Sequence, residues 1–173
     1  SKVKIGLLSD NHSHWDARMD YHLKDCHEIW HAGDIGSFAV TDAIHALNPN
    51  RSRIVYGNID DHVMRAEFEE ELSWEIQGIS FYMTHIGGRP GRYAKGIRTK
   101  LTQKKPDVFV CGHSHLLLIK RDVTWGGLYL NPGACGIHGF HQKRTLVTFE
   151  ILNGKLDHMR VVELGNRFTK IGV

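Results

Sequence analysis

The feature that most constrains the fold of this 173-residue chain is a repeated pattern, in which an apolar segment is followed at once by Asp, Asn or His. From one occurrence to the next, the sequence is long enough for about one strand and one connecting segment. Because ligands bind beyond the carboxyl ends of strands in open α/β sheets, we expect these polar groups to converge on one site. The pattern occurs at Asp10-Asn11-His12, Gly33-Asp34, Gly57-Asn58-Ile59-Asp60, Thr84-His85 and Cys111-Gly112-His113-Ser114-His115.

The first 60 residues alternate between predicted strands and predicted helices. Apolar segments that end in turn-forming residues predict strands, and apolar residues at helical spacing predict helices. The strands are expected at residues 3–8, 28–32 and 53–56, and the helices at residues 15–24 and 38–47. This order predicts a mostly parallel sheet with crossover helices.

After Asp61 the pattern changes to one of hairpins. Gln77-Gly78 and Asn153-Gly154 are tight-turn signals between alternating segments. No linker or repeat divides the chain, so we expect a single α/β domain over residues 1–173 with two sheets, the second largely antiparallel. The strands are expected at residues 72–76, 79–84, 107–111, 117–120, 123–125, 128–130, 146–152 and 155–163, with a basic helix at 92–104.

Composition excludes several classes of protein. The 22 Lys and Arg against 19 Asp and Glu leave a net charge of only +3, which excludes a histone-like protein or an acidic tail. Three cysteines without a CxxC pair indicate neither a disulfide framework nor a thiolate zinc site. Without a signal-peptide pattern or an apolar run of about 18 residues, we expect a cytoplasmic protein with no membrane partner.

The polar groups carry donors suited to a metal. In an extended backbone residues i and i+2 point to the same side, so we expect Asp10 with His12, and His113 with His115, to act in pairs. Carboxylate, amide and imidazole donors without thiolate suit a first-row divalent ion. Each group alone is common as a simple turn, but together they favour two ions that share a carboxylate. The candidate ligands are Asp10, His12, Asp34, Asn58, His85, His113 and His115.

The motifs Asp-x-His, Gly-Asp, Gly-Asn-x-Asp, His and Gly-His-x-His, in this order, resemble those of the calcineurin-like metallophosphoesterases. The short chain is similar to the small YfcE- and Vps29-like branch, of which Asn131-Pro132-Gly133 is also typical. The resemblance covers residues 3–162. It implies an α/β fold in which a sandwich of two mixed sheets is flanked by helices (α/β/β/α).

The resemblance also implies a dinuclear centre with a divided ligand set. One ion would be held by Asp10, His12, Asp34 and His115, and the other by Asp34, Asn58, His85 and His113. Asp34 would bridge the two ions, for which manganese is favoured over iron, nickel or zinc.

The activity implied by the resemblance is hydrolysis of a small phosphoester, most of all a phosphodiester, by a hydroxide between two metal ions. Asp34, Asn58 and His85 would be the catalytic residues. The alternative is a non-catalytic, Vps29-like scaffold for protein interactions. Scaffold relatives tend to lose a metal-site histidine, so the complete ligand set favours catalysis.

One position departs from the family pattern. Many relatives have a histidine after the Gly-Asn pair, where it contacts the phosphate and protonates the leaving group, but this chain has Ile59. A missing general acid costs about 10²–10⁴-fold in rate, so we expect a preference for good leaving groups. His14, His62 and His138 are candidate substitutes, although each is better explained as a surface or supporting histidine.

Asp60, His31 and Arg89 are further candidates for supporting the ligands or contacting the substrate. Arg89 begins a basic run that is explained either as a solvated helix face or as a surface for phosphate or nucleic acid. Because no aromatic residues are interleaved with this run, the sequence does not indicate a nucleic-acid partner, although it does not exclude one. The sequence is also compatible with a homo-oligomer. The run comprises Arg89, Arg92, Lys95, Arg98, Lys100, Lys104 and Lys105.

Overall fold

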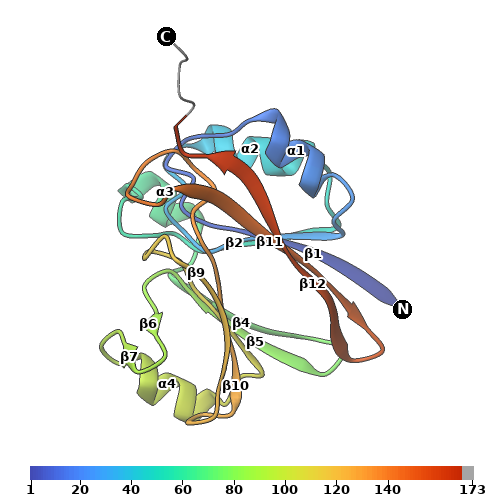
Figure 1. The fold of residues 1–173 in the computed structure, drawn as a ribbon, viewed down its shortest axis with the longest axis vertical. Coiled ribbons are helices and arrows are strands. Elements are labelled where there is room, and N and C mark those ends of the chain that lie inside the picture. Colours follow the sequence, from blue (N-terminus) through green and yellow to red (C-terminus); the bar gives the residue numbers. More distant parts are fainter. Residues whose placement is uncertain (169–173) are drawn as a thin grey trace.

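The computed structural model describes residues 1–168 and contains two five-stranded sheets packed face to face, with helices on their outer sides (Figure 1). The first sheet has the order β12-β11-β1-β2-β3 and the second the order β4-β5-β8-β10-β9. The first comprises β1 (Lys2–Leu8), β2 (Glu28–His31), β3 (Arg51–Ile54), β11 (Lys143–Leu152) and β12 (Lys155–Asn166). The second comprises β4 (Glu71–Ile76), β5 (Ile79–Thr84), β8 (Val108–Val110), β9 (Leu117–Asp122) and β10 (Gly127–Pro132).

The other secondary structure of residues 1–168 consists of four helices and a small hairpin. In Figure 1, α1 (Ala17–Leu23) and α2 (Phe38–Ala46) cover the first sheet, and α4 (Ile97–Lys104) lies against the second. The short helix α3 (His62–Glu67) and the hairpin of β6 (Gly88–Arg89) and β7 (Arg92–Tyr93) lie on the same side of the molecule. None of these helices has the length and apolar character needed to span a bilayer.

The two mixed sheets confirm the expected fold class, and β1, β2 and β3 are parallel as predicted. The prediction that the second sheet is largely antiparallel was wrong, because β8 pairs in parallel with both β5 and β10. Helix α4 connects β5 to β8, and such a crossover places two strands parallel. The last hairpin, β11 and β12, joins the first sheet beside β1.

Local hydrogen bonds explain the other differences from the predicted elements. Residues 123–125 form a turn rather than a strand, because the Asp122 carboxylate accepts hydrogen bonds from the backbone N–H and the hydroxyl of Thr124. Helix α4 begins at Ile97 rather than at residue 92, because Arg92 pairs with Arg89 in the hairpin. Helix α3, which was not predicted, begins at the N-cap Asp61, whose carboxylate accepts from a backbone N–H.

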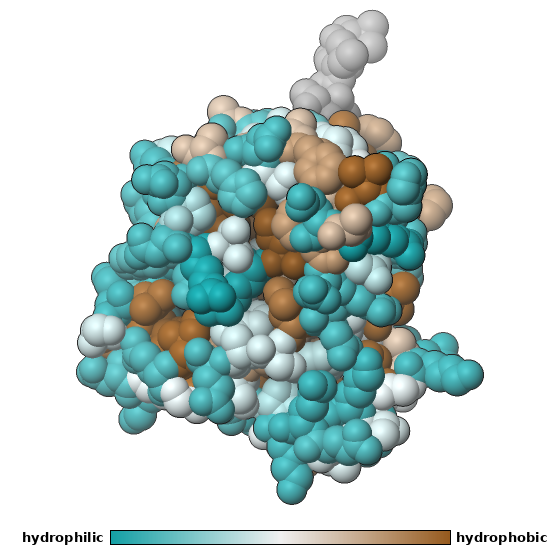
Figure 2. All heavy atoms as spheres, turned by 180° about the vertical axis from the view of Figure 1, so that it is seen from behind, coloured by the Kyte–Doolittle hydropathy of each residue, from teal (hydrophilic) through white to brown (hydrophobic). Residues whose placement is uncertain are grey.

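The main core fills the space between the sheets. Trp30 of β2 makes edge-to-face contacts with Trp74, Phe81 and Phe149, with ring centroids 4.8 to 5.5 Å apart. Smaller cores lie beneath the helices. On the reverse face of the molecule, exposed hydrophobic residues form separate groups among hydrophilic ones (Figure 2). The aromatic core holds the strands of both sheets in place, and therefore also the loops at their carboxyl ends.

Candidate metal centre

The structure brings the predicted ligand residues together at one edge of the sandwich. Each lies in a loop directly after a strand: β1, β2, β3, β5 or β8. Two triads offer ligand atoms within 4.8 Å of one another, Asp10 with His12 and His115, and Asp34 with His85 and His113. The seventh residue, Asn58, lies beside the second triad, with its Oδ1 3.0 Å from Nδ1 of His113.

In the first triad, one carboxylate oxygen of Asp10 is held by hydrogen bonds and the other is free. Oδ2 accepts from the hydroxyl of Ser9 at 2.6 Å and from the backbone N–H of His113 at 3.1 Å. Oδ1 lies 3.3 Å from Nε2 of His115 and 3.9 Å from Nε2 of His12. Asp10 therefore presents a fixed oxygen between two imidazoles.

In the second triad, His85 is oriented by the backbone. Its Nδ1 lies 2.7 Å from the carbonyl oxygen of Ala32, which only accepts, so the proton is on Nδ1 and Nε2 faces the site. Nε2 is 3.2 Å from Oδ1 of Asp34. Burial disfavours the protonated form of His85, but Asp34 and Asp10 outweigh burial and raise its pKa.

Asp34 belongs to the second triad and also faces the first. Its Oδ1 faces His85 at 3.2 Å, and its Oδ2 faces His12 at 3.3 Å. Burial alone would raise the pKa of Asp34, but the two nearby histidines outweigh burial and hold the pKa well below its usual range. The arrangement suits a carboxylate that binds one cation with each oxygen.

The backbone is not extended at five of the seven candidate ligands. Positive φ angles occur at Asp10 (60°), His12 (45°), Asp34 (59°), His113 (71°) and His115 (62°). The prediction that residues i and i+2 pair through an extended strand was therefore wrong: Asp10 and His12 do share a triad, whereas His113 and His115 belong to different triads. Non-glycine residues in the left-handed region cost of order 1 kcal/mol or more each, and such strain clusters at functional sites.

Two glycines allow the ligand loops to approach closely. A Cβ atom at Gly57 would collide with the backbone and carboxylate of Asp34, and one at Gly112 would collide with the hydroxyl of Ser9. Any larger residue at either position would displace a candidate ligand or the group that orients it. The loops after β2, β3 and β8 therefore depend on glycine for their packing.

Unpartnered buried atoms test whether the site fits a metal. In residues 1–168, three of the six buried side-chain N and O atoms without a hydrogen-bond partner are Asp10 Oδ1, His12 Nε2 and His85 Nε2. Buried polar atoms normally have partners, and these three point toward one another. Oxygen and imidazole donors of this kind are ligands for first-row divalent ions, so the residues fit the predicted centre.

His31 does not line the site but forms hydrogen bonds that hold the ligand loops in place. It is fully buried, its Nε2 lies 2.7 Å from Oδ1 of Asn11, and its Nδ1 accepts from the backbone N–H of Gly33. Burial, opposed by nearby carboxylates, lowers the pKa of His31 to about 4. The neutral ring therefore ties the loop after β1 to the loop after β2.

Asp60 also has a structural position. Its buried carboxylate accepts hydrogen bonds from the backbone N–H groups of Ile35 (3.2 Å), Gly36 (2.8 Å) and Gly57 (2.8 Å). It thereby fastens the loop that carries Asp34 to the loop that carries Asn58.

We expect Asp60→Ala to lower the free energy of unfolding by about 3 kcal/mol, because it leaves two buried backbone donors and one partly buried donor without partners. Urea denaturation followed by circular dichroism measures the loss. Asp61→Ala is the matched control, since it removes an adjacent carboxylate that caps α3 through one N–H, at a cost of about 1 kcal/mol. Equal losses in the two variants would contradict this role for Asp60.

The remaining predicted residues do not join the two triads. Arg89, on β6, lines a separate cleft with Arg92 and Leu116, and its side chain forms no hydrogen bond or ion pair among the described residues. Ile59 donates its backbone N–H to Oδ1 of Asp34 at 3.1 Å, while its side chain is 44% exposed. His62 is an exposed residue of α3.

Two histidines lie beside the first triad: His138, which the sequence indicated only as a substitute acid or a supporting residue, and His141, which was missed. His138 stacks on His12 with ring centroids 4.6 Å apart, and His141 meets His115 edge to face at 5.2 Å. Both belong to a Gly-x-His-Gly-x-His segment, residues 136–141. That spacing in a chain with 13 histidines was the available signal.

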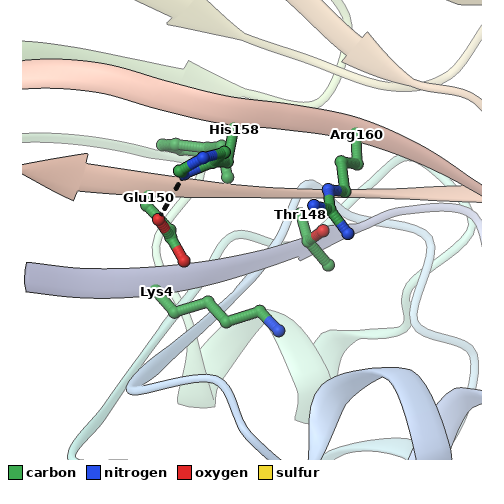
Figure 3. A pocket seen from close by; sticks show the side chains of 6 residues that line it. Lys4, Thr148, Glu150, His158 and Arg160 are labelled. Carbon is green, nitrogen blue, oxygen red and sulfur yellow. Dashed lines mark hydrogen bonds and ion pairs between the residues drawn. The ribbon is translucent and has the colours of Figure 1, made fainter.

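A separate hollow lies on the outer face of the first sheet and is lined by Lys4, Thr148, Glu150, His158 and Arg160 (Figure 3). Glu150 already pairs with His158 at 2.7 Å. None of these residues is a candidate ligand, so the hollow is distinct from the metal centre.

Comparisons with known proteins agree with this geometry. The domain model of the calcineurin-like phosphoesterase superfamily matches residues 3–154. A comparison with curated protein sequences finds no match.

Several solved structures share the fold. A novel archaeal phosphodiesterase is 23% identical, with a TM-score of 0.74, over 93% of this chain and 99% of that chain. Vps29 from Chaetomium thermophilum is 10% identical, with a TM-score of 0.75, over 95% and 99%. Vps29 from Entamoeba histolytica, complexed with zinc, is 17% identical, with a TM-score of 0.66, over 92% and 98%.

At these identities the structures show a shared fold, whereas the family match spans most of the chain and includes all seven candidate ligands. Taken with the two facing triads, the match shows that this chain belongs to the calcineurin-like phosphoesterase superfamily.

Proposed function

We propose that this protein is a divalent-metal-dependent phosphodiesterase. The observation that carries the proposal is the pair of triads, with Asp34 of the second directing one carboxylate oxygen to His85 of its own triad and the other to His12 of the first. Family membership supports a phosphoesterase, and the similar fold of an archaeal phosphodiesterase supports the diester class.

The residues would divide into two ligand sets. Asp10, His12 and His115 would hold one ion, His85, His113 and Asn58 the other, and Asp34 would contact both. Two divalent ions would supply Lewis acidity and an activated water at this edge of the sheet. Manganese is the favoured metal, with iron, nickel and zinc as alternatives, and zinc is the ion in the Entamoeba histolytica Vps29 complex.

The chain's own residues would position the reaction. The hydrogen bonds on Oδ2 of Asp10 and on Nδ1 of His85 fix their free ligand atoms in advance, so little reorganisation is needed when ions and substrate bind. The low pKa of Asp34 keeps its carboxylate ionised. Beside it, Ile59 offers an apolar side chain and thus no proton for a leaving group.

The non-catalytic alternative, a protein-interaction scaffold, is supported by the similar fold of Vps29. A scaffold has no need of unpartnered, strained ligand residues, and this site retains both complete triads. That difference favours catalysis.

The test is hydrolysis of bis(4-nitrophenyl) phosphate by the metal-free protein and after addition of Mn²⁺. We expect turnover that rises at least 100-fold with metal and is lost again on chelation. Undetectable turnover with Mn²⁺, Fe²⁺, Ni²⁺ and Zn²⁺ would support the scaffold instead, and turnover that does not depend on metal would contradict the proposed metal dependence.

A further inference from the structure

A cleft of about 420 Å³ opens directly from the second triad. Its inner wall includes Asn58 and His85, and its outer walls come from α3 on one side and the start of α4 on the other. The volume is that of a small-molecule pocket. A group attached to a phosphate at the metal centre would extend into this cleft.

One wall of the cleft presents a fixed cation. The Nε of Arg65 donates to the carbonyl oxygen of Asp60 at 2.8 Å, and its Nη2 donates to that of Asn58 at 3.1 Å. The guanidinium also lies 5.0 Å from the ring centroid of Tyr56. These neutral partners orient the guanidinium without cancelling its charge.

The opposite wall carries a second uncompensated cation. Lys95 is exposed and forms no hydrogen bond or ion pair among residues 1–168. Lys100 is different, because its Nζ lies 2.6 Å from Oε2 of Glu71 and the pair is neutral. Glu70 is the remaining carboxylate of the lining, so the cleft keeps a net positive charge.

We propose that this cleft is an anion subsite in which Arg65 and Lys95 bind a second negatively charged group on one ester substituent of the substrate. The inference rests on the proposed phosphodiesterase function and narrows its substrate class. The preferred substrates are phosphodiesters that carry a carboxylate or a further phosphate, rather than diesters with neutral substituents.

Two matched substrates test the subsite: 4-nitrophenyl phenyl phosphate, and its analogue with a carboxylate at the para position of the phenyl ring. Both release 4-nitrophenolate, so the leaving group is constant and only the distal charge changes. We expect the wild-type protein with Mn²⁺ to show a kcat/KM about 10-fold higher for the carboxylated substrate. An exposed charge pair contributes up to about a 5-fold effect, and two cations act here.

Arg65→Ala and Lys95→Ala should each lower this ratio about 3-fold, and the double variant should bring it close to 1. The readout is the ratio, so a general loss of turnover does not affect it. Arg98→Ala is the matched control: it removes the same charge from α4 outside the cleft, where Arg98 contacts Thr124, and should keep the wild-type ratio.

The outcomes separate the two proposals. A wild-type ratio near 1, or an undiminished ratio in the double variant, would overturn the anion subsite while leaving the phosphodiesterase function intact. Absence of metal-dependent hydrolysis of either substrate and of bis(4-nitrophenyl) phosphate would overturn both. Added salt should lower the wild-type ratio and leave that of the double variant unchanged, because exposed charges are screened.

Discussion

Replacing Asp34 with alanine is expected to lower metal-dependent kcat/KM by about 10³-fold or more. The two carboxylate oxygens of Asp34 face histidines of different triads at 3.2 and 3.3 Å, whereas Asp10 approaches His85 of the second triad only at 3.8 Å. A bound divalent ion contributes several kcal/mol to transition-state stabilisation, and each 1.36 kcal/mol changes the rate 10-fold. Steady-state hydrolysis of bis(4-nitrophenyl) phosphate measures the loss.

Two variants guard against misinterpretation of this result. Asp34→Asn keeps the shape of the side chain and should also lose activity, because an amide does not replace the charge between the ions. Asp42→Ala removes an exposed carboxylate from α2 and should keep wild-type turnover. Folded Asp34 variants with activity within 10-fold of wild type would show that Asp34 does not bridge a catalytic centre.

The second large effect concerns Ile59. Without a proton donor at this position, the leaving group departs unprotonated, so the rate should fall steeply as the leaving group becomes more basic. We expect aryl diesters to be hydrolysed at least about 100-fold faster than alkyl diesters. Turnover measured over a series of leaving groups gives this dependence.

Ile59→His should restore the missing donor and weaken that dependence. The position is adjacent to Asn58 and half exposed, so a histidine fits without entering the core. Recovery of even part of the 10²–10⁴-fold contribution of a general acid would raise alkyl-diester turnover by at least 10-fold. Ile59→Val is the control and should leave the leaving-group dependence unchanged. Equal turnover of alkyl and aryl diesters by the wild-type protein would contradict this account.

The convergence of the seven candidate ligands was predictable because it follows from strand order. An apolar strand followed by a polar residue places that residue at a sheet edge, and parallel neighbours bring such edges together. The backbone conformation there was not predictable. The left-handed φ angles of Asp10 and His113 arise from contacts between loops distant in sequence, such as the bond from the N–H of His113 to Asp10.

Other features that the sequence did not predict also depend on contacts between segments distant in the chain. Local patterns predicted that β11 and β12 form a hairpin, but only tertiary packing places that hairpin beside β1. Asp60 was predicted as a candidate for supporting the ligands or contacting the substrate, but its partners, which include Gly36, 24 residues away in the chain, are set by tertiary packing. The six residues of α3 are too few to give a periodic signal.

The most direct test of the central claim is a crystal structure of the protein with Mn²⁺, with the ions located by anomalous scattering at the manganese edge. Our account predicts two peaks, one beside Asp10, His12 and His115 and the other beside His85, His113 and Asn58, with Asp34 in contact with both. A single peak, or none at these residues at saturating Mn²⁺, would contradict a dinuclear centre bridged by Asp34.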